Sequence, residues 1–356
     1  MQPDSTAGRP HPPDRGDVVR TPDPTIAAAP ASAAPPAAST TAPATAGTPA
    51  PLARFGGARP RAPRWYAEAI AQAPQRTFHT VHGARIETLT WGRIGDPGLL
   101  LLHGNGAHAD WWSFIAPMLA DGHRVTAMSW SGMGGSDWRT RYAMDLHVDE
   151  AFAVARESGL FEARRRPVFI GHSFGGFPTI ACAARQGERL HAAIALDSPL
   201  FTREQRAARH AKRGPPRPPH PSRIYPSLEA ALARFRFMPP QDCENLFLVD
   251  HIARGSIKEV RNEDGTPGWT WRFDPFMWRD YERGDSAAEL ARVRCPFGLI
   301  RGARSALVQP SVFAFARCVA PPGSPAIEVP DADHHVMADQ PLALVAALRG
   351  LLATWP

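Results

Sequence analysis

A serine between two glycines is the first residue whose surroundings suggest chemistry. Residues 168–184 read VFIGHSFGGFPTIACAA, so Ser173 lies between Gly171 and Gly175. An apolar, strand-like run precedes the motif, and small and apolar residues typical of a helix follow it. Between a strand and a helix, G-x-S-x-G holds the serine on a sharp, strained turn with its hydroxyl above the sheet. A Cβ atom at position 171 or 175 would crowd the neighbouring strand and helix. The pattern therefore predicts that Ser173 is a nucleophile.

A second glycine-rich turn lies earlier in the chain. The apolar run of residues 99–102 ends at His103, Gly104 and Asn105. We expect the N–H groups of Asn105 and of Phe174 to form an oxyanion hole, because a backbone turn and a helix N-terminus both direct N–H groups at developing negative charge. The amide of Asn105 is a second donor in the same place. His103 is either a catalytic base or a brace that holds the loop by hydrogen bonds, and its place at a strand end favours the brace.

Short strand-like runs alternate with helical stretches from about Arg64 onward. This alternation is typical of a parallel or mixed sheet covered by helices. The middle runs are continuously apolar, as expected of strands buried on both faces. The predicted strands are residues 77–81, 85–91, 98–102, 124–129, 168–171, 192–196, 297–300 and 326–329, and the predicted helices are residues 111–119, 144–157 and 174–186.

The alternation stops between about residues 200 and 290 and resumes at Cys295. The interruption contains a basic run at 203–223, an amphipathic helical stretch within 226–237 and the aromatic sequence GWTWRFDPFMW at 268–278. A separate domain is the alternative, but the return of strand-like residues favours an insertion over the carboxyl edge of the sheet. We therefore predict a core made of residues 63–200 and 291–356, and a cap made of residues 201–290.

These features together resemble proteins of the α/β-hydrolase fold. The likeness is carried by the Ser173 motif, the His-Gly-Asn turn and residues 124–138, RVTAMSWSGMGGSDW, which are similar to the family's strand followed by G-x-G-x-S. It covers roughly residues 64–355. The resemblance implies a mostly parallel eight-stranded sheet with helices on both faces and a cap after the sixth strand. It also implies a Ser–His–acid triad in the chain order nucleophile, acid, histidine, and it implies no metal or organic cofactor.

The resemblance places the catalytic histidine after the last strand, where the sequence reads PDADHH at 330–335. Members of the family usually have Gly-His in this turn. Alignment on that pair puts Asp333 at the glycine position and implies that His334 is the base. His335 is the alternative, because both histidines lie on the same turn.

The third member of the triad is missing from its usual place. The resemblance implies that an acid most often follows the seventh strand, but RGARSALVQP at 301–310 contains no Asp or Glu. Aligned on Gly302, the acid would fall at Ser305 or Ala306, and a neutral side chain supports an imidazolium less well than a carboxylate does. Asp197, at the end of the sixth predicted strand, is the leading hypothesis, because some members of the fold carry the acid there.

Three alternatives to a catalytic Asp197 stay open. Asp197 holds its loop without a catalytic role, the site works as a Ser173–His334 dyad, or the site is inactive. Asp331 is a further acid, although it is close along the chain to the histidine that it would have to orient.

A serine nucleophile favours acyl transfer to water over the dehalogenase and epoxide hydrolase reactions of this fold, which need a carboxylate nucleophile. We predict a serine hydrolase that forms an acyl-enzyme on Ser173 and cleaves an ester or related acyl bond of a small-to-medium hydrophobic substrate. C–C bond hydrolysis and cofactor-free perhydrolysis use the same triad and are alternatives. A non-catalytic ligand-binding protein is the alternative of another class. Five aromatic side chains of the cap either line an apolar pocket or form the cap's own core: Phe235, Phe237, Trp269, Trp271 and Phe276.

Composition limits the remaining possibilities. Residues 1–62 are predicted to be a disordered tail, because residues 25–53 are mostly Ala, Pro, Thr and Ser. No apolar run is long enough to span a membrane, and a cytoplasmic location is predicted. Four widely spaced cysteines indicate reduced thiols. The net charge is +6, and the basic run at 203–223 could attract nucleic acid, anionic lipid or an acidic substrate. A solvated helix and linker is favoured instead, so a small-molecule substrate and no nucleic acid are expected, and the oligomeric state stays open.

Overall fold

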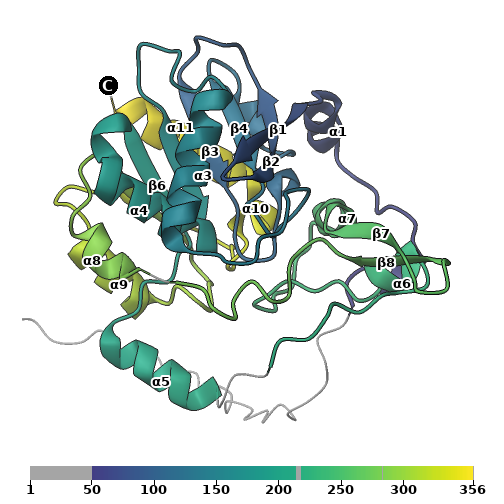
Figure 1. Ribbon diagram of the computed structural model, residues 1–356. Helices are drawn as coiled ribbons and strands as arrows, with labels where there is room; N and C mark the ends of the chain where they lie inside the picture. Colours follow the sequence, from purple (N-terminus) through teal and green to yellow (C-terminus); the bar gives the residue numbers. More distant parts are fainter. Residues whose placement is uncertain (1–49, 214–217, 283, 356) are drawn as a thin grey trace, which may run out of the picture. The chain divides into compact units, whose positions relative to one another are not determined.

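The computed structural model describes residues 50–213, 218–282 and 284–355. Its main element is an eight-stranded sheet with the strand order β1-β2-β4-β3-β5-β6-β9-β10 (Figure 1). Antiparallel pairing joins β1 to β2 and β2 to β4, and the remaining neighbours pair in parallel. The expected α/β-hydrolase fold class is thus confirmed. The strands are β1 (Gln75–Val81), β2 (Ala84–Trp91), β3 (Gly98–Leu102), β4 (Arg124–Met128), β5 (Val168–His172), β6 (Ala192–Leu196), β9 (Phe297–Gly302) and β10 (Ala326–Val329).

Helices cover both faces of the sheet because the central strands are apolar on both. Along β3, Leu99 and Leu101 enter one hydrophobic cluster, while Leu100 and Leu102 enter the other. One face packs against α3 (Met144–Glu157), α4 (Gly176–Gln186), α8 (Ser286–Leu290) and α9 (Pro310–Val319). The opposite face packs against α1 (Arg64–Ala71), α2 (Ala116–Leu119), α10 (Val336–Asp339) and α11 (Pro341–Thr354).

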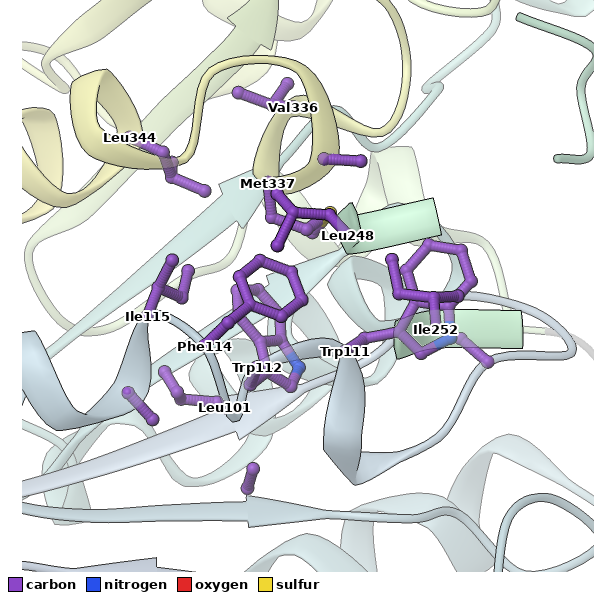
Figure 2. Close-up of a cluster of buried hydrophobic side chains, with 14 of the residues drawn as sticks. Leu101, Trp111, Trp112, Phe114, Ile115, Leu248, Ile252, Val336, Met337 and Leu344 are labelled. Atoms are coloured by element: carbon purple, nitrogen blue, oxygen red, sulfur yellow. The ribbon is translucent and has the colours of Figure 1, made fainter. Parts of the chain in front are cut away.

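The hydrophobic cluster that contains Leu99 and Leu101 also reaches into the inserted region. Figure 2 shows Leu101 of β3 below Trp112 and Phe114, with Met337 of α10 and Leu248 of α7 (Leu246–Gly255) above them. All five side chains are fully buried. Burial of a large apolar side chain contributes about 1.5–3 kcal/mol. The core of the sheet and that of the insertion are therefore continuous on this side.

The insertion lies between β6 and β9. It contains α5 (Arg203–Arg213), α6 (Leu228–Leu232), α7 and an antiparallel hairpin of β7 (Ile257–Arg261) and β8 (Pro267–Trp271). The segment after β8, residues 272–282, is called the return segment here, and it runs beside the loop after β4. The N–H of Gly134 donates to the carbonyl of Arg272, and the N–H of Asp274 donates to that of Gly132. The boundaries of the cap at residues 201 and 290 stay a prediction. The last helix before β9, α8, packs on α4 of the core.

Four of the five cap aromatic side chains pack in the hydrophobic cluster that the insertion shares with the sheet. Phe235 and Phe237 are buried, and their rings meet edge to face at 5.5 Å between centroids. Trp271 packs on Phe235, and Trp269 joins the same cluster. Phe276 lies instead under the guanidinium of Arg279. This arrangement corresponds to the second of the two interpretations of these aromatic residues.

The eight predicted strands are all present, with ends that agree within two residues. The single helix predicted at 111–119 is wrong: a 3₁₀ turn at Ala109–Trp111 is followed by the separate α2. Pro117 explains the break, because a proline lacks the N–H group of a helix interior and is tolerated in a first turn, as it is in α2.

The boundary predicted for the tail needs a correction. Residues 1–49 lie outside the described residues, but Leu52 is buried in the core and Phe55 packs beside it, so the boundary at residue 62 is too late. Among the helices of the described ranges, none has the length and apolarity needed to cross a membrane.

Candidate active site

Ser173 occupies the strained turn that its flanking glycines predict. It follows β5, begins a 3₁₀ turn (Ser173–Gly175) that leads into α4, and has a φ angle of +52°. A non-glycine residue with positive φ is uncommon and is found where the surroundings enforce it. A Cβ atom on Gly171 would lie 2.2 Å from the carbonyl oxygen of Gly175, and one on Gly175 would lie 2.5 Å from that of Leu102. One on Gly176 would lie 1.8 Å from Ser198 Oγ. Glycine is thus required at three positions around the serine.

Three predicted side chains meet at the carboxyl edge of the sheet. His334 Nε2 lies 2.8 Å from Ser173 Oγ, and His334 Nδ1 lies 2.7 Å from Asp197 Oδ1. Asp197 is 0% exposed and His334 is 2% exposed. A carboxylate can only accept hydrogen bonds, so Nδ1 carries the proton and Nε2 is free to accept the proton of the serine hydroxyl. The structure brings together Ser173, His334 and Asp197 in the order of a triad.

The loop after β9 supports Asp197. The N–H of Gly302 donates to Oδ2 at 2.7 Å, and the hydroxyl of Ser305 donates to Oδ1 at 2.6 Å. The N–H of Val308 in turn donates to Ser305 Oγ at 3.0 Å, which fixes the direction of the hydroxyl proton. Ser305, the residue aligned with the usual acid, therefore bonds the carboxylate rather than the histidine. The alternative Asp331 is exposed and lies 3.6 Å from Arg304.

His335 and His103, the alternative candidates for the base, form hydrogen bonds with other partners than Ser173. His335 turns toward the cap, where its Nδ1 lies 2.6 Å from Gln241 Oε1 and its ring stacks on Phe237 at 4.6 Å. His103 accepts the N–H of Trp130 at Nε2, while its Nδ1 lies 2.7 Å from the carbonyl oxygen of Gly104. Burial lowers the pKa of His103 to about 3, so it is neutral in the folded protein. His103 thus braces the loop.

A fourth histidine precedes the nucleophile directly. His172 is buried, and its Nε2 lies 2.9 Å from the carbonyl oxygen of His334. Burial, and then the facing ring of His334, lower the pKa of His172 well below its ordinary value. A neutral imidazole that donates to this carbonyl holds the turn of His334 in place without adding a positive charge beside it.

The predicted oxyanion donors border the same space. Asn105 and Phe174 both line the cavity that contains Ser173. A Cβ atom on Gly104 would lie 3.1 Å from Ser173 Cβ, which shows how closely this turn approaches the nucleophile. Asn105 Oδ1 accepts a hydrogen bond from Trp278 Nε1 at 3.1 Å, so the Asn105 side chain is held by the cap's return segment.

The cavity at Ser173 has a volume of about 620 Å³, within the range of small-molecule sites. Of the lining residues, the sequence predicted only Asn105, Ser173 and Phe174 as site residues, and the ones it missed include Trp278, Tyr281, Arg206 and Arg209 from the insertion. The signal for the two arginines was the basic run, but nothing in it indicated which side of the helix would face the nucleophile. The lining residues are Asn105, Met144, Ser173, Phe174, Phe177, Pro199, Leu200, Phe201, Arg206, Arg209, Trp278, Tyr281, Gly284, Ser286, Ala287 and Leu307.

A larger groove of about 1410 Å³ lies on the other side of the His335 turn. Charged side chains such as Arg236, Asp242 and Asp339 line it, and Ser173 does not. Burial raises the pKa of Asp339 to about 6. The smaller cavity is the candidate active site, because it contains Ser173, the predicted nucleophile. In the part of the chain that the structure describes, no three His, Cys, Asp or Glu side chains are grouped so that they could hold a metal ion.

Comparisons with known proteins agree with the fold. A model of the alpha/beta hydrolase family matches residues 99–348. The esterase Rv0045c of Mycobacterium tuberculosis is 27% identical over 296 residues, which make up 81% of this chain and 93% of the esterase. A crystal structure of that esterase has a TM-score of 0.61 at 23% identity and covers 82% of this chain and 97% of its own. The thioesterase domain from the curacin biosynthetic pathway has a TM-score of 0.62 at 21% identity, with coverage of 79% and 99%. At these identities the two structures show a shared fold.

Proposed function

The chain belongs to the alpha/beta hydrolase family and is a hydrolase, and from that premise we propose that it cleaves carboxylic esters through an acyl-enzyme on Ser173. The observation that carries the proposal is the chain of hydrogen bonds from Ser173 Oγ through His334 to Asp197, at 2.8 and 2.7 Å. The esterase Rv0045c supports the same reaction by its similarity. The apolar residues around Ser173 favour a small-to-medium hydrophobic substrate.

Acylation begins with the serine hydroxyl. Ser173 Oγ attacks the ester carbonyl carbon while its proton moves to His334 Nε2, and the carbonyl π electrons move to the oxygen. The N–H groups of Asn105 and Phe174 stabilise that oxyanion. When the tetrahedral intermediate collapses, the C–O bond to the alcohol breaks and His334 returns the proton to the leaving oxygen. The ionised Asp197 stabilises the imidazolium that exists between these two steps.

Deacylation repeats the sequence with water. His334 Nε2 takes a proton from a water molecule as the water attacks the acyl carbon, and then gives the proton to Ser173 Oγ as the acyl–oxygen bond breaks. An ester on serine can be hydrolysed in this way. An alkyl ether on serine, which an epoxide would give, lacks a carbonyl to attack. The serine therefore favours acyl substrates.

A fluorophosphonate probe tests the proposal. We expect it to label the wild-type protein at Ser173 and to leave Ser173→Ala unlabelled. A serine is activated only where a base lies within hydrogen-bond distance, as His334 Nε2 does for Ser173. Ser286→Ala is a matched control, since Ser286 lines the same cavity at the start of α8. It should be labelled like the wild type. The same three proteins should be assayed on p-nitrophenyl esters of increasing acyl length.

An unlabelled wild-type protein that hydrolyses none of these esters would contradict the proposal. It would point instead to the non-catalytic ligand-binding protein, with the cavity kept and the chemistry lost. Turnover that persists in Ser173→Ala would contradict the acyl-enzyme mechanism.

A further inference from the structure

Two arginines of the insertion line the same cavity as the nucleophile. Arg206 and Arg209 come from α5 and border the 620 Å³ space that contains Ser173. Residues three apart in a helix lie on one side of it, so the two guanidinium groups face the cavity together. Part of the basic run at 203–223 therefore lines the candidate active site.

A capping box sets the start of α5 just after the loop that follows β6. The N–H of Thr202 donates to Gln205 Oε1 at 2.9 Å, and the N–H of Gln205 donates to Thr202 Oγ1 at 3.2 Å. These reciprocal bonds satisfy two N–H groups at a helix N-terminus and set where the helix begins. Because Thr202 follows Asp197 by five residues, the capping box places Arg206 in the first turns after the end of β6.

Packing then directs the second arginine. The guanidinium of Arg209 lies over the ring of Phe201, 4.4 Å from its centroid. Phe201 itself lines the cavity, next to the buried Leu200. A guanidinium that packs on an aromatic ring is held in place by it, and its planar fork of N–H groups can bind an anion at two points.

The charges around the cavity have one sign. Among its described lining residues, the charged side chains are Arg206 and Arg209, and the others are apolar or neutral. The nearest acid along α8, Asp285, accepts the N–H groups of Ala287 and Ala288 at the start of that helix. Glu204, in the first turn of α5, is exposed and does not line the cavity. A substrate group that approaches the arginines thus meets positive charge in a cavity whose other described lining residues carry no charge.

We propose that Arg206 and Arg209 bind an anionic group, a carboxylate or a phosphate, at the end of the substrate away from the scissile ester. This inference rests on the proposed ester hydrolysis at Ser173 and names its substrate class: an amphipathic ester with an apolar middle and a negatively charged end. Guanidinium pairs bind both oxyacid anions in the same forked geometry, so the chemistry of the site is shared between the two.

Matched pairs of substrates test the proposal. The first pair is p-nitrophenyl hydrogen adipate and p-nitrophenyl methyl adipate, which differ in one negative charge at the acyl end. The second pair carries a phosphonate or its dimethyl ester there, and the third carries a carboxylate or its methyl ester on the alcohol. We expect the wild type to favour at least one anionic member by about tenfold in kcat/KM, the effect of a single charged hydrogen bond. Which pair responds identifies the anion and the end of the ester that carries it.

The variants assign the preference to residues. Arg206→Gln and Arg209→Gln should each reduce severalfold the ratio of kcat/KM for the anionic ester to that for its neutral partner, because the neutral substrate makes no ion pair. Arg209→Lys should restore part of it. Arg203→Gln removes an exposed charge of the same helix that does not line the cavity, and should keep the preference. The preference should also weaken with added salt.

Each result decides one question. A wild type that hydrolyses neutral esters through Ser173 but favours no anionic partner would overturn the arginine site and leave the proposed function standing. A preference that survives both Gln variants, or that Arg203→Gln reduces equally, would also overturn it, since a general field of α5 would then be responsible. A protein that hydrolyses no ester at all would instead remove the proposed function on which the inference rests.

Discussion

The ends of β6 and β9 lie side by side in the sheet and contribute in opposite ways to one carboxylate. The end of β6 supplies the charged group, Asp197, in a left-handed conformation with φ +45°. The end of β9 supplies two donors to it, the N–H of Gly302 and the hydroxyl of Ser305. A buried charge is tolerated when hydrogen bonds and a partner surround it. The comparison teaches that an acid can stand on one strand while the neighbouring strand, from which it is absent, provides its environment.

Removal of the charge at the β6 end is expected to have the largest effect. Asp197→Asn should lower kcat about 10⁴-fold, because an amide at this place favours the wrong tautomer of His334. Ester turnover at saturating substrate measures the loss, and an unchanged melting temperature shows that the fold is intact. A loss below about tenfold would mean that Ser173 and His334 work as a dyad. It would contradict the idea that the end of β6 supplies a catalytic carboxylate which the end of β9 supports.

Transfer of the charge to the β9 end should recover part of this loss. Ser305 Oγ bonds the same carboxylate oxygen that His334 Nδ1 contacts, so a carboxylate at position 305 would lie near the histidine. We expect Asp197→Asn/Ser305→Asp to exceed Asp197→Asn by about 10–100-fold in kcat, since a charged acceptor again holds Nδ1. Ser305→Asp alone serves as the control. A folded double variant with no recovery would show that only the β6 end can hold the acid.

Loss of a donor at the β9 end should have the smallest effect. Ser305→Ala removes one of the hydrogen bonds to Asp197, and a bond to a charged group contributes about 1.5–3 kcal/mol. Because Gly302 and His334 still bond the carboxylate, we expect a fall of about 3–10-fold in kcat, together with a lower melting temperature. Ser305→Thr keeps the hydroxyl and should stay near the wild type. A loss as large as that of Asp197→Asn would make Ser305 an equal partner in the triad.

Much of the fold and of the candidate site could be predicted from sequence because those parts depend on local patterns. The strands were visible as apolar runs, and the turn around Ser173 was visible in its glycines. The absence of an acid between Gly302 and Pro310 was itself informative, since it directed attention to Asp197. The donors that Ser305 and Gly302 give to Asp197 were not foreseen, because they depend on the register of β6 against β9.

The inserted region was less predictable, for a physical reason. A helix such as α5 has a polar face toward solvent and another toward whatever packs on it, and sequence alone does not say which is which. The aromatic residues of β8 had two interpretations for the same reason. Trp278, at the end of the aromatic sequence 268–278, and Tyr281 were not predicted to line the cavity. Side chains on an insertion obtain their roles from the way it docks on the core. The break in the helix predicted at 111–119, by contrast, was readable from Pro117 and was missed.

The three glycines around Ser173 also fix how closely the neighbouring elements approach it. Gly171 contacts the turn of its own strand, Gly175 contacts the carbonyl groups that end β3, and Gly176 contacts Ser198 just past β6. The turn proposed to form the oxyanion hole follows β3, and Asp197 follows β6. The close contacts of Gly175 and Gly176 therefore set the spacing between these two elements and Ser173. A single methyl group at position 175 or 176 would therefore keep Ser173, His334 and Asp197 in the sequence but change the distances between them.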